Sequence, residues 1–151
     1  MKQVISLVGG AAGAPILSAR LSSVAGIVAG MLVNESAGTV IKHAGAGLNA
    51  QRLFAQPNLA SAGDIDAVYA NGETVSYGAY RQGQEVNALV GIVAAIAEGD
   101  ALESAGDGTL RKAVADAATD TTQRDSIVGY ALEAVDNSVG AANVRLKIRV
   151  A

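Results

Sequence analysis

The chain lacks several residue types from which active and structural sites are commonly built. It has no cysteine and no tryptophan, and it has one histidine and one phenylalanine in 151 residues. The absence of cysteine excludes disulfides and thiolate metal sites, and it leaves the redox compartment open. A metal site would have to rely on carboxylates, because the single histidine supplies only one nitrogen ligand.

Strong positive charge and long apolar runs are missing as well. The net charge of −3 disfavours direct binding of nucleic acid, which needs a basic face to displace counterions. No run approaches the ~18 apolar residues that a membrane-spanning helix requires. The stretch after Lys2 superficially suggests a signal peptide, but Gly9-Gly10, Gly13 and Pro15 interrupt it, so we do not expect secretion.

Small residues are abundant instead, with 31 alanines and 18 glycines. Aromatic side chains bury the most area per residue and small ones bury little, so we expect a thin core. The length indicates one domain, and an isolated subunit should have modest stability. Such a protein can gain stability from partners that bind only its folded state.

The clearest pattern is the alternation in the last run of the chain, residues 143–150. Side chains on a strand alternate between faces, so this run predicts a strand with one apolar and one cationic face. The cationic face has three interpretations: a solvated surface, an edge that discourages strand pairing, or a contact to an acidic partner. The apolar face has Val144, Leu146, Ile148 and Val150, and the cationic face has Arg145, Lys147 and Arg149.

Short β-type runs separated by turn signals also occur earlier in the chain. Asn71-Gly72 is a strong hairpin signal between residues 67–70 and 74–80. Residues 86–97 fit a strand or a buried helix, and Gly91 favours the strand. For residues 16–33 we prefer short strands with glycine turns over a helix. Strands at this spacing predict an all-β fold, either a jelly-roll-like sandwich or a small β-barrel.

The N-terminal part differs from the rest in composition. Residues 3–8 could form a first strand, and residues 9–15 are so rich in glycine and alanine that they are typical of a mobile or docked arm. We therefore expect an extended arm or first strand over residues 1–22 and a single β domain over residues 23–151.

No convincing catalytic set is present. His43 has no G-x-S-x-G motif to serve, so we interpret it as a solvent-facing or capping residue. Asp64 and Asp66 lack an EF-hand pattern and are typical of a solvated loop. Residues 45–50 match G-x-G-x-x-A, but Pro57 follows too soon for the helix that a dinucleotide site requires. We expect no enzyme activity, cofactor or metal.

Three tyrosines allow a second interpretation. Tyr69, Tyr77 and Tyr80 could form a platform for sugar stacking, which would make the chain a β-sandwich module that binds glycans or a host surface. We prefer core packing, because a carbohydrate module usually needs more exposed aromatic area.

A series of short motifs resembles the small capsid decoration, or cement, proteins of tailed bacteriophages. The similarity covers about residues 24–150. Two earlier pieces, at residues 30–33 and 53–55, resemble the same family. The main pieces, in order, are Tyr69 with Gly72-Glu73-x-Val75, then residues 83–89, 99–104 and 106–110, and finally residues 129–136 with the alternating last strand.

This resemblance implies a small all-β fold of jelly-roll or β-tulip type and no catalysis or cofactor. It implies oligomers, dimeric or trimeric, on the exterior of an icosahedral virion shell of the HK97 type, made in the host cytoplasm. The implied partners are the major capsid protein and further copies of the chain, without a membrane or direct nucleic-acid contact. We expect the partner contacts at Gln3, Val4, Ile5, Leu7, Pro15, Ile16, Arg145, Lys147 and Arg149.

Overall fold

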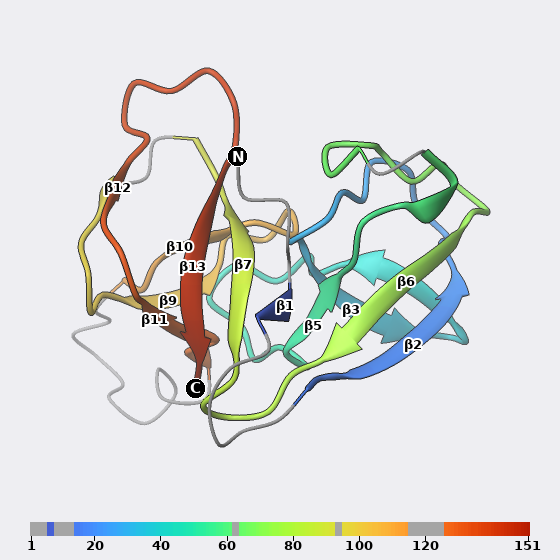
Figure 1. The fold of residues 1–151 in the computed structure, drawn as a ribbon, viewed down its shortest axis with the longest axis horizontal. Helices are drawn as coiled ribbons and strands as arrows, with labels where there is room; N and C mark the ends of the chain where they lie inside the picture. Colours follow the sequence, from blue (N-terminus) through green and yellow to red (C-terminus); the bar gives the residue numbers. More distant parts are fainter. Residues whose placement is uncertain (1–5, 8–13, 62–63, 93–94, 115–125) are drawn as a thin grey trace.

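The computed structural model describes residues 6–7, 14–61, 64–92, 95–114 and 126–151, and its fold is shown in Figure 1. The elements named within these ranges are short strands and one 3-10 turn, η1 (Leu59–Ser61). The strands are β1 (Ser6–Leu7), β2 (Ile16–Leu21), β3 (Leu32–Ser36), β4 (Thr39–Lys42), β5 (Leu53–Ala55), β6 (Thr74–Ala79), β7 (Glu85–Val90), β8 (Ala95–Ile96), β9 (Ala101–Ser104), β10 (Leu110–Lys112), β11 (Gly129–Ala131), β12 (Val135–Asp136) and β13 (Val144–Val150).

Five of these strands close into a barrel, on the left of Figure 1. The sheet order is β1-β7-β10-β9-β11-β13, and β13 pairs with β7 as well. The antiparallel β13–β7 ladder runs from Val144↔Val90 to Arg149↔Glu85 and closes the ring β7-β10-β9-β11-β13, with β1 attached to β7. Closure leaves the barrel strands with few free edges. A separate two-stranded ladder joins β12 to β8.

The second sheet lies on the right of Figure 1 and has the order β2-β6-β5-β3-β4. Its β3–β4 hairpin turns at Ala37 and Gly38, with φ of 49° and 81°. Positive φ at both central residues defines a type I′ turn, whose twist suits a two-residue hairpin. At the other edge of this sheet, Val40 of β4 forms one parallel bridge with Ser22, the residue that follows β2.

The two sheets have separate cores that meet along β3 and β5. Leu32 and Phe54 belong to the same buried cluster as the barrel interior, whereas their neighbours Val33 and Leu53 belong to the cluster of the second sheet. Successive residues on a strand face opposite sides, so one face of this sheet packs on the barrel. Phe54 there meets Tyr80 edge to face, with ring centroids 5.5 Å apart.

The all-β prediction is confirmed, and of the forms considered the closed barrel is present. In β13, Leu146, Ile148 and Val150 are buried while the intervening cations are more exposed, as the alternation indicates. β13 also pairs antiparallel with β11.

Within residues 86–97 the sequence left a helix open, and the described part contains two strands, β7 up to Val90 and β8 at Ala95–Ile96. β7 is buried from Val86 to Val90, Asn87 included, because both of its faces are covered, and its outer side meets the segment that leads into β3. The Leu89 N–H donates to the carbonyl of Gly30 at 2.8 Å. Strands buried on both faces lose the alternation that identifies half-buried ones.

One local prediction was wrong. The Asn71-Gly72 turn does not join a hairpin, because β6 pairs with β2 and β5 and Tyr69 bridges to Ile27. Gly72 has φ of +84° but Asn71 does not have positive φ, which fits a type II turn rather than the hairpin type.

Candidate functional surfaces

The three cations of the last strand have different environments. Lys147 and Arg149 both contact Glu85 on the neighbouring β7, with N···O distances of 3.3 and 3.1 Å. The hydrogen bond from Arg149, with a further contribution from Lys147, lowers the pKa of the Glu85 carboxyl. These cations remain accessible to a partner, but their charge is partly balanced.

Arg145 instead points into the junction between the barrel and the second sheet. Its Nη2 donates to the carbonyls of Ala29 and Ile65 at 3.0 and 2.8 Å, and its Nη1 contacts the Asp66 carboxylate at 2.6 Å. The side chain is only 12% exposed. Arg145 therefore has an internal role, and the cationic surface of this strand is formed by Lys147 and Arg149.

The candidate contacts near the N-terminus are described only in part. Gln3, Val4 and Ile5 lie outside the described residues, as do residues 8–13 of the expected arm. Leu7 belongs to β1, which pairs with β7. Pro15 is half-buried and Ile16 begins β2, where it is exposed.

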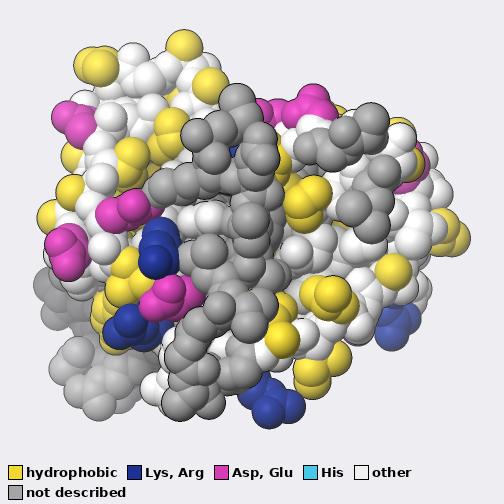
Figure 2. All heavy atoms as spheres, viewed as in Figure 1, with side chains coloured by type: hydrophobic (Ala, Val, Ile, Leu, Met, Phe, Trp, Pro, Cys, Tyr) yellow, Lys and Arg dark blue, Asp and Glu magenta, His cyan; other side chains and the backbone are white. Residues whose placement is uncertain are grey.

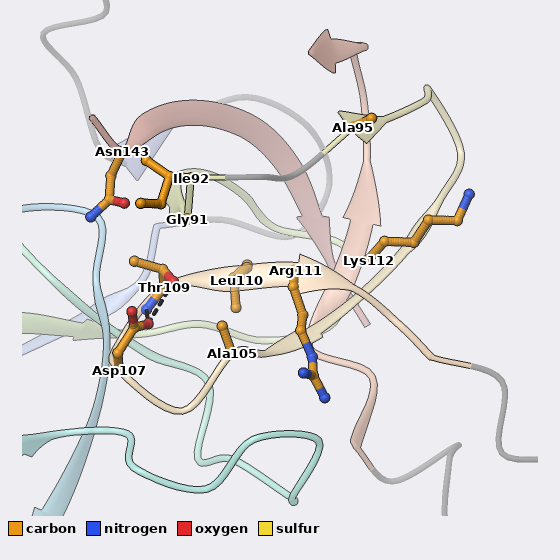
Figure 3. Close-up of a pocket in the computed structure, with 10 residues that line it drawn as sticks. All are labelled: Gly91, Ile92, Ala95, Ala105, Asp107, Thr109, Leu110, Arg111, Lys112 and Asn143. Atoms are coloured by element: carbon orange, nitrogen blue, oxygen red, sulfur yellow. Dashed lines mark hydrogen bonds between the residues drawn. The ribbon is translucent and has the colours of Figure 1, made fainter. Parts of the chain in front are cut away.

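A hollow of about 490 Å³ with mixed polar and apolar lining lies beside β10 (Figure 3). Arg111 and Lys112 stand at its rim, and each is paired with a carboxylate, Glu103 at 2.8 Å and Asp100 at 2.9 Å. Asp107 accepts hydrogen bonds from the backbone and hydroxyl of Thr109. These groups are occupied in ion pairs and turn geometry, and the residues lining the hollow do not form a nucleophile–base pair.

His43 is buried, which corrects the solvent-facing interpretation and leaves the capping one. Its Nε2 lies 3.1 Å from the Asn49 carbonyl and its Nδ1 lies 2.7 Å from Ser104 Oγ. Because the carbonyl can only accept, Nε2 carries the proton and Nδ1 accepts from the Ser104 hydroxyl. Ser104 is fully buried, so this pair holds two loops together without access for a substrate.

The remaining motifs also have structural roles. Residues 45–50 form a loop that leads into β5 rather than into a helix, so the dinucleotide match lacks its context. The Asp64 carboxylate accepts from the Asp66 N–H at 2.9 Å, which is an Asx turn. Among the residues that the structure describes, no group of three acidic or histidine side chains could hold a metal ion. No described helix is long and apolar enough to cross a bilayer.

The aromatic residues do not form a stacking platform. The chain has four tyrosines and one phenylalanine, and Phe54, Tyr69, Tyr77 and Tyr80 are buried while Tyr130 is 47% exposed. The Tyr77 hydroxyl donates to Glu35, and burial, followed by this bond, raises the pKa of Tyr77. Core packing was therefore the correct interpretation of the first three tyrosines.

The surface that sequence reasoning missed is β2. All six of its side chains are exposed, including Leu17 and Leu21. Beside it lies an apolar hollow of about 500 Å³, lined by Leu17, Ser18, Ala19, Gln56, Pro57 and Ser76. In Figure 2 the lower right, the region of β2, shows several apolar side chains with Lys or Arg side chains beside them, whereas acids and bases are intermixed over the barrel. The one available signal was an apolar run with a single charge, Arg20.

Comparison with known proteins gives a structural likeness and no sequence match. No protein-family model matches the chain, and no curated protein matches it. Among solved structures, the head fiber gp8.5 N base of bacteriophage phi29 is similar, with a TM-score of 0.58 and 14% sequence identity. The alignment covers 90% of this chain and 93% of that chain. At this identity the likeness shows the fold alone.

Proposed function

We propose that this chain is a structural protein of a bacteriophage virion that decorates the outside of the head. The observation that carries the proposal is the near-complete overlap, 90% of this chain and 93% of the other, with a head fiber base. The motif series that resembles capsid decoration proteins supports it independently. The charges at the rim of the hollow beside β10 are paired and the hollow beside β2 is apolar, which fits a binding role better than a catalytic one.

The proposed partner is the major capsid protein. A clip that spans two capsid subunits loses contacts when they separate, so its binding free energy adds to the barrier for opening the shell. Stable interfaces bury about 1,200–2,000 Å² in total, and a symmetric oligomer can hold several subunits at once. We assign the contacts to the N-terminal segment, Gln3 to Ile16, and to Lys147 and Arg149 on the barrel.

The first test is co-sedimentation of the purified protein with undecorated heads of the phage that encodes it. We expect saturable binding, and heads that resist heat or osmotic shock better when decorated. Deletion of residues 1–15 should weaken binding while the β-sheet circular dichroism is retained. Failure of the full-length chain to sediment with the heads would contradict the proposal.

A charge reversal tests the barrel contact. Arg149 and Lys112 are matched, because they are 55% and 57% exposed and each is paired with a carboxylate. We expect Arg149→Glu to lower the affinity for heads several-fold and Lys112→Glu to leave it unchanged. Equal effects of the two variants would argue against this face.

A further inference from the structure

The strand β2 has the features of an unprotected sheet edge. It runs along the outer margin of the second sheet in Figure 1. Among the described strands the sheet order ends at β2, and β4 reaches it only at the Ser22↔Val40 bridge. Sheet edges that remain unpaired are usually protected by lysine, proline, a bulge or a covering segment. Arg20, the one charge on β2, is directed back toward Glu35 at 3.6 Å.

The ladder with β6 fixes which backbone groups of β2 face outward. Ser22 N–H donates to Glu73 at 2.8 Å, on the β6 side. Successive residues of an antiparallel strand direct their N–H and C=O groups to opposite sides. Ile16, Ser18 and Arg20 therefore bond toward β6, and the backbone groups of Leu17 and Ala19 point away from it.

We propose that β2 pairs antiparallel with β2 of a second copy of this chain, about a two-fold axis through Ser18. In this register Leu17 lies opposite Ala19 of the second copy, and Ala19 opposite its Leu17, so the outward groups of both strands satisfy one another. Ile16 lies opposite Arg20, which keeps the two arginines apart. Moving the two-fold axis to Ala19 would place Leu17 opposite Leu21, where β4 already approaches, and moving it to Leu17 would use Pro15, which has no N–H to donate.

The side chains favour the same arrangement. Leu17 and Ala19 share the sheet face that contains the apolar hollow, so pairing places four apolar side chains together there. The two five-stranded sheets become one continuous sheet, in which the backbone edge supplies hydrogen bonds and the outer face supplies apolar burial. The pairing defines a self-contact of the chain that begins at Ile16, the last residue of the segment proposed to contact the capsid protein. Its tests measure association in solution, so it can fail independently of head binding.

A single cysteine reports the register directly, because the chain has none of its own. Ser18 faces its own copy as a non-hydrogen-bonded pair, for which Cα atoms are about 4.5 Å apart, within disulfide range. Leu17 is diagonal to its own copy at about 7–8 Å, which is too far. We expect Ser18→Cys to form a disulfide-linked dimer on mild oxidation and Leu17→Cys to form far less. Equal cross-linking of both, or of neither, would overturn the register.

Association is measured by sedimentation equilibrium over rising protein concentration. Leu17 and Leu48 are matched apolar residues, 65% and 63% exposed. We expect twice the monomer mass for the wild type and for Leu48→Lys, and the monomer mass for Leu17→Lys. Ala19→Pro removes an outward N–H at an edge position that tolerates proline, so it should also be monomeric.

Two results would overturn the proposal. One is a wild-type chain that stays monomeric at every concentration, and the other is an oligomer that persists in both Leu17→Lys and Ala19→Pro. Circular dichroism confirms that each variant is folded. If neither variant folds, the Ser18→Cys and Leu17→Cys comparison decides the question.

Discussion

Replacement of Arg145 by methionine tests how the barrel and the second sheet are held together. The guanidinium donates to two partly buried carbonyls, Ala29 and Ile65, and contacts Asp66. Hydrogen bonds to a charged group contribute about 1.5–3 kcal/mol each, and partly buried groups fall at the low end. The Asp66 side chain is 70% exposed, so the ion pair itself contributes at most about 1 kcal/mol.

We therefore expect Arg145→Met to lower the free energy of unfolding by about 3 kcal/mol, most of it from the two carbonyls. Asp66→Asn should cost less than about 1 kcal/mol. Arg145→Lys keeps the charge but not the planar fork, and should fall between the two. Because a domain of this size is stable by about 5–15 kcal/mol, all three variants should remain folded at low temperature.

The assay is urea unfolding followed by far-ultraviolet circular dichroism, analysed for midpoint and slope. The reasoning fails if Arg145→Met unfolds within about 1 kcal/mol of the wild type. It also fails if Asp66→Asn is as costly as Arg145→Met, because the exposed ion pair and not the carbonyls would then hold the junction.

Three further predictions concern stability. Gly30→Ala should cost at least about 2 kcal/mol more than Gly38→Ala in the same urea assay. Both glycines have positive φ, so the backbone strain is similar in the two variants. A Cβ at Gly30 would lie 2.7 Å from the Asn87 carbonyl oxygen, whereas a Cβ at Gly38 would meet nothing within 4 Å. His43→Ala should cost about 1–3 kcal/mol, because the buried Ser104 O–H loses its acceptor while its oxygen keeps only the bond from the Gly106 N–H, and an equally stable variant would contradict the cap. Glu85→Gln should flatten the loss of thermal stability between about pH 5 and pH 3. The lowered pKa of Glu85 in the folded state stabilises the fold at pH values above the unfolded pKa. This stabilisation disappears as the pH falls through the folded pKa.

The strands could be predicted where a pattern of neighbouring residues marks them. They could be predicted less well where contacts between residues far apart in the sequence decide the structure. β13 shows alternation over its whole length because one face is buried in the barrel. The role of Arg145 on that strand has no local signal, since its partners Ala29 and Ile65 lie 116 and 80 residues away in sequence. The cationic pattern therefore predicted a strand face but not that one of its three charges is used internally.

The same reasoning accounts for the errors at His43 and at Asn71-Gly72. His43 is buried because its loop meets that of Ser104, 61 residues away, and nothing adjacent in sequence indicates this. The Asn-Gly pair does form a turn, but the partners of β6 are chosen by long-range packing. Local residues set the backbone conformation, whereas the pairing depends on which strands bury β6.

The two proposed surfaces lie on different sheets, which has a consequence for binding strength. β13 with Lys147 and Arg149 belongs to the barrel, and β2 belongs to the second sheet (Figure 1). Pairing through β2 leaves both barrel faces of a dimer free to contact a shell, and linking two sites can raise affinity by about 10²–10⁴ without a new contact. Leu17→Lys should therefore weaken head binding although it touches no capsid subunit, and cross-linked Ser18→Cys should bind at least as tightly as the wild type. If the cross-linked dimer bound heads no better than monomeric Leu17→Lys, the two surfaces could not be engaged together, and one of the two assignments would have to be withdrawn.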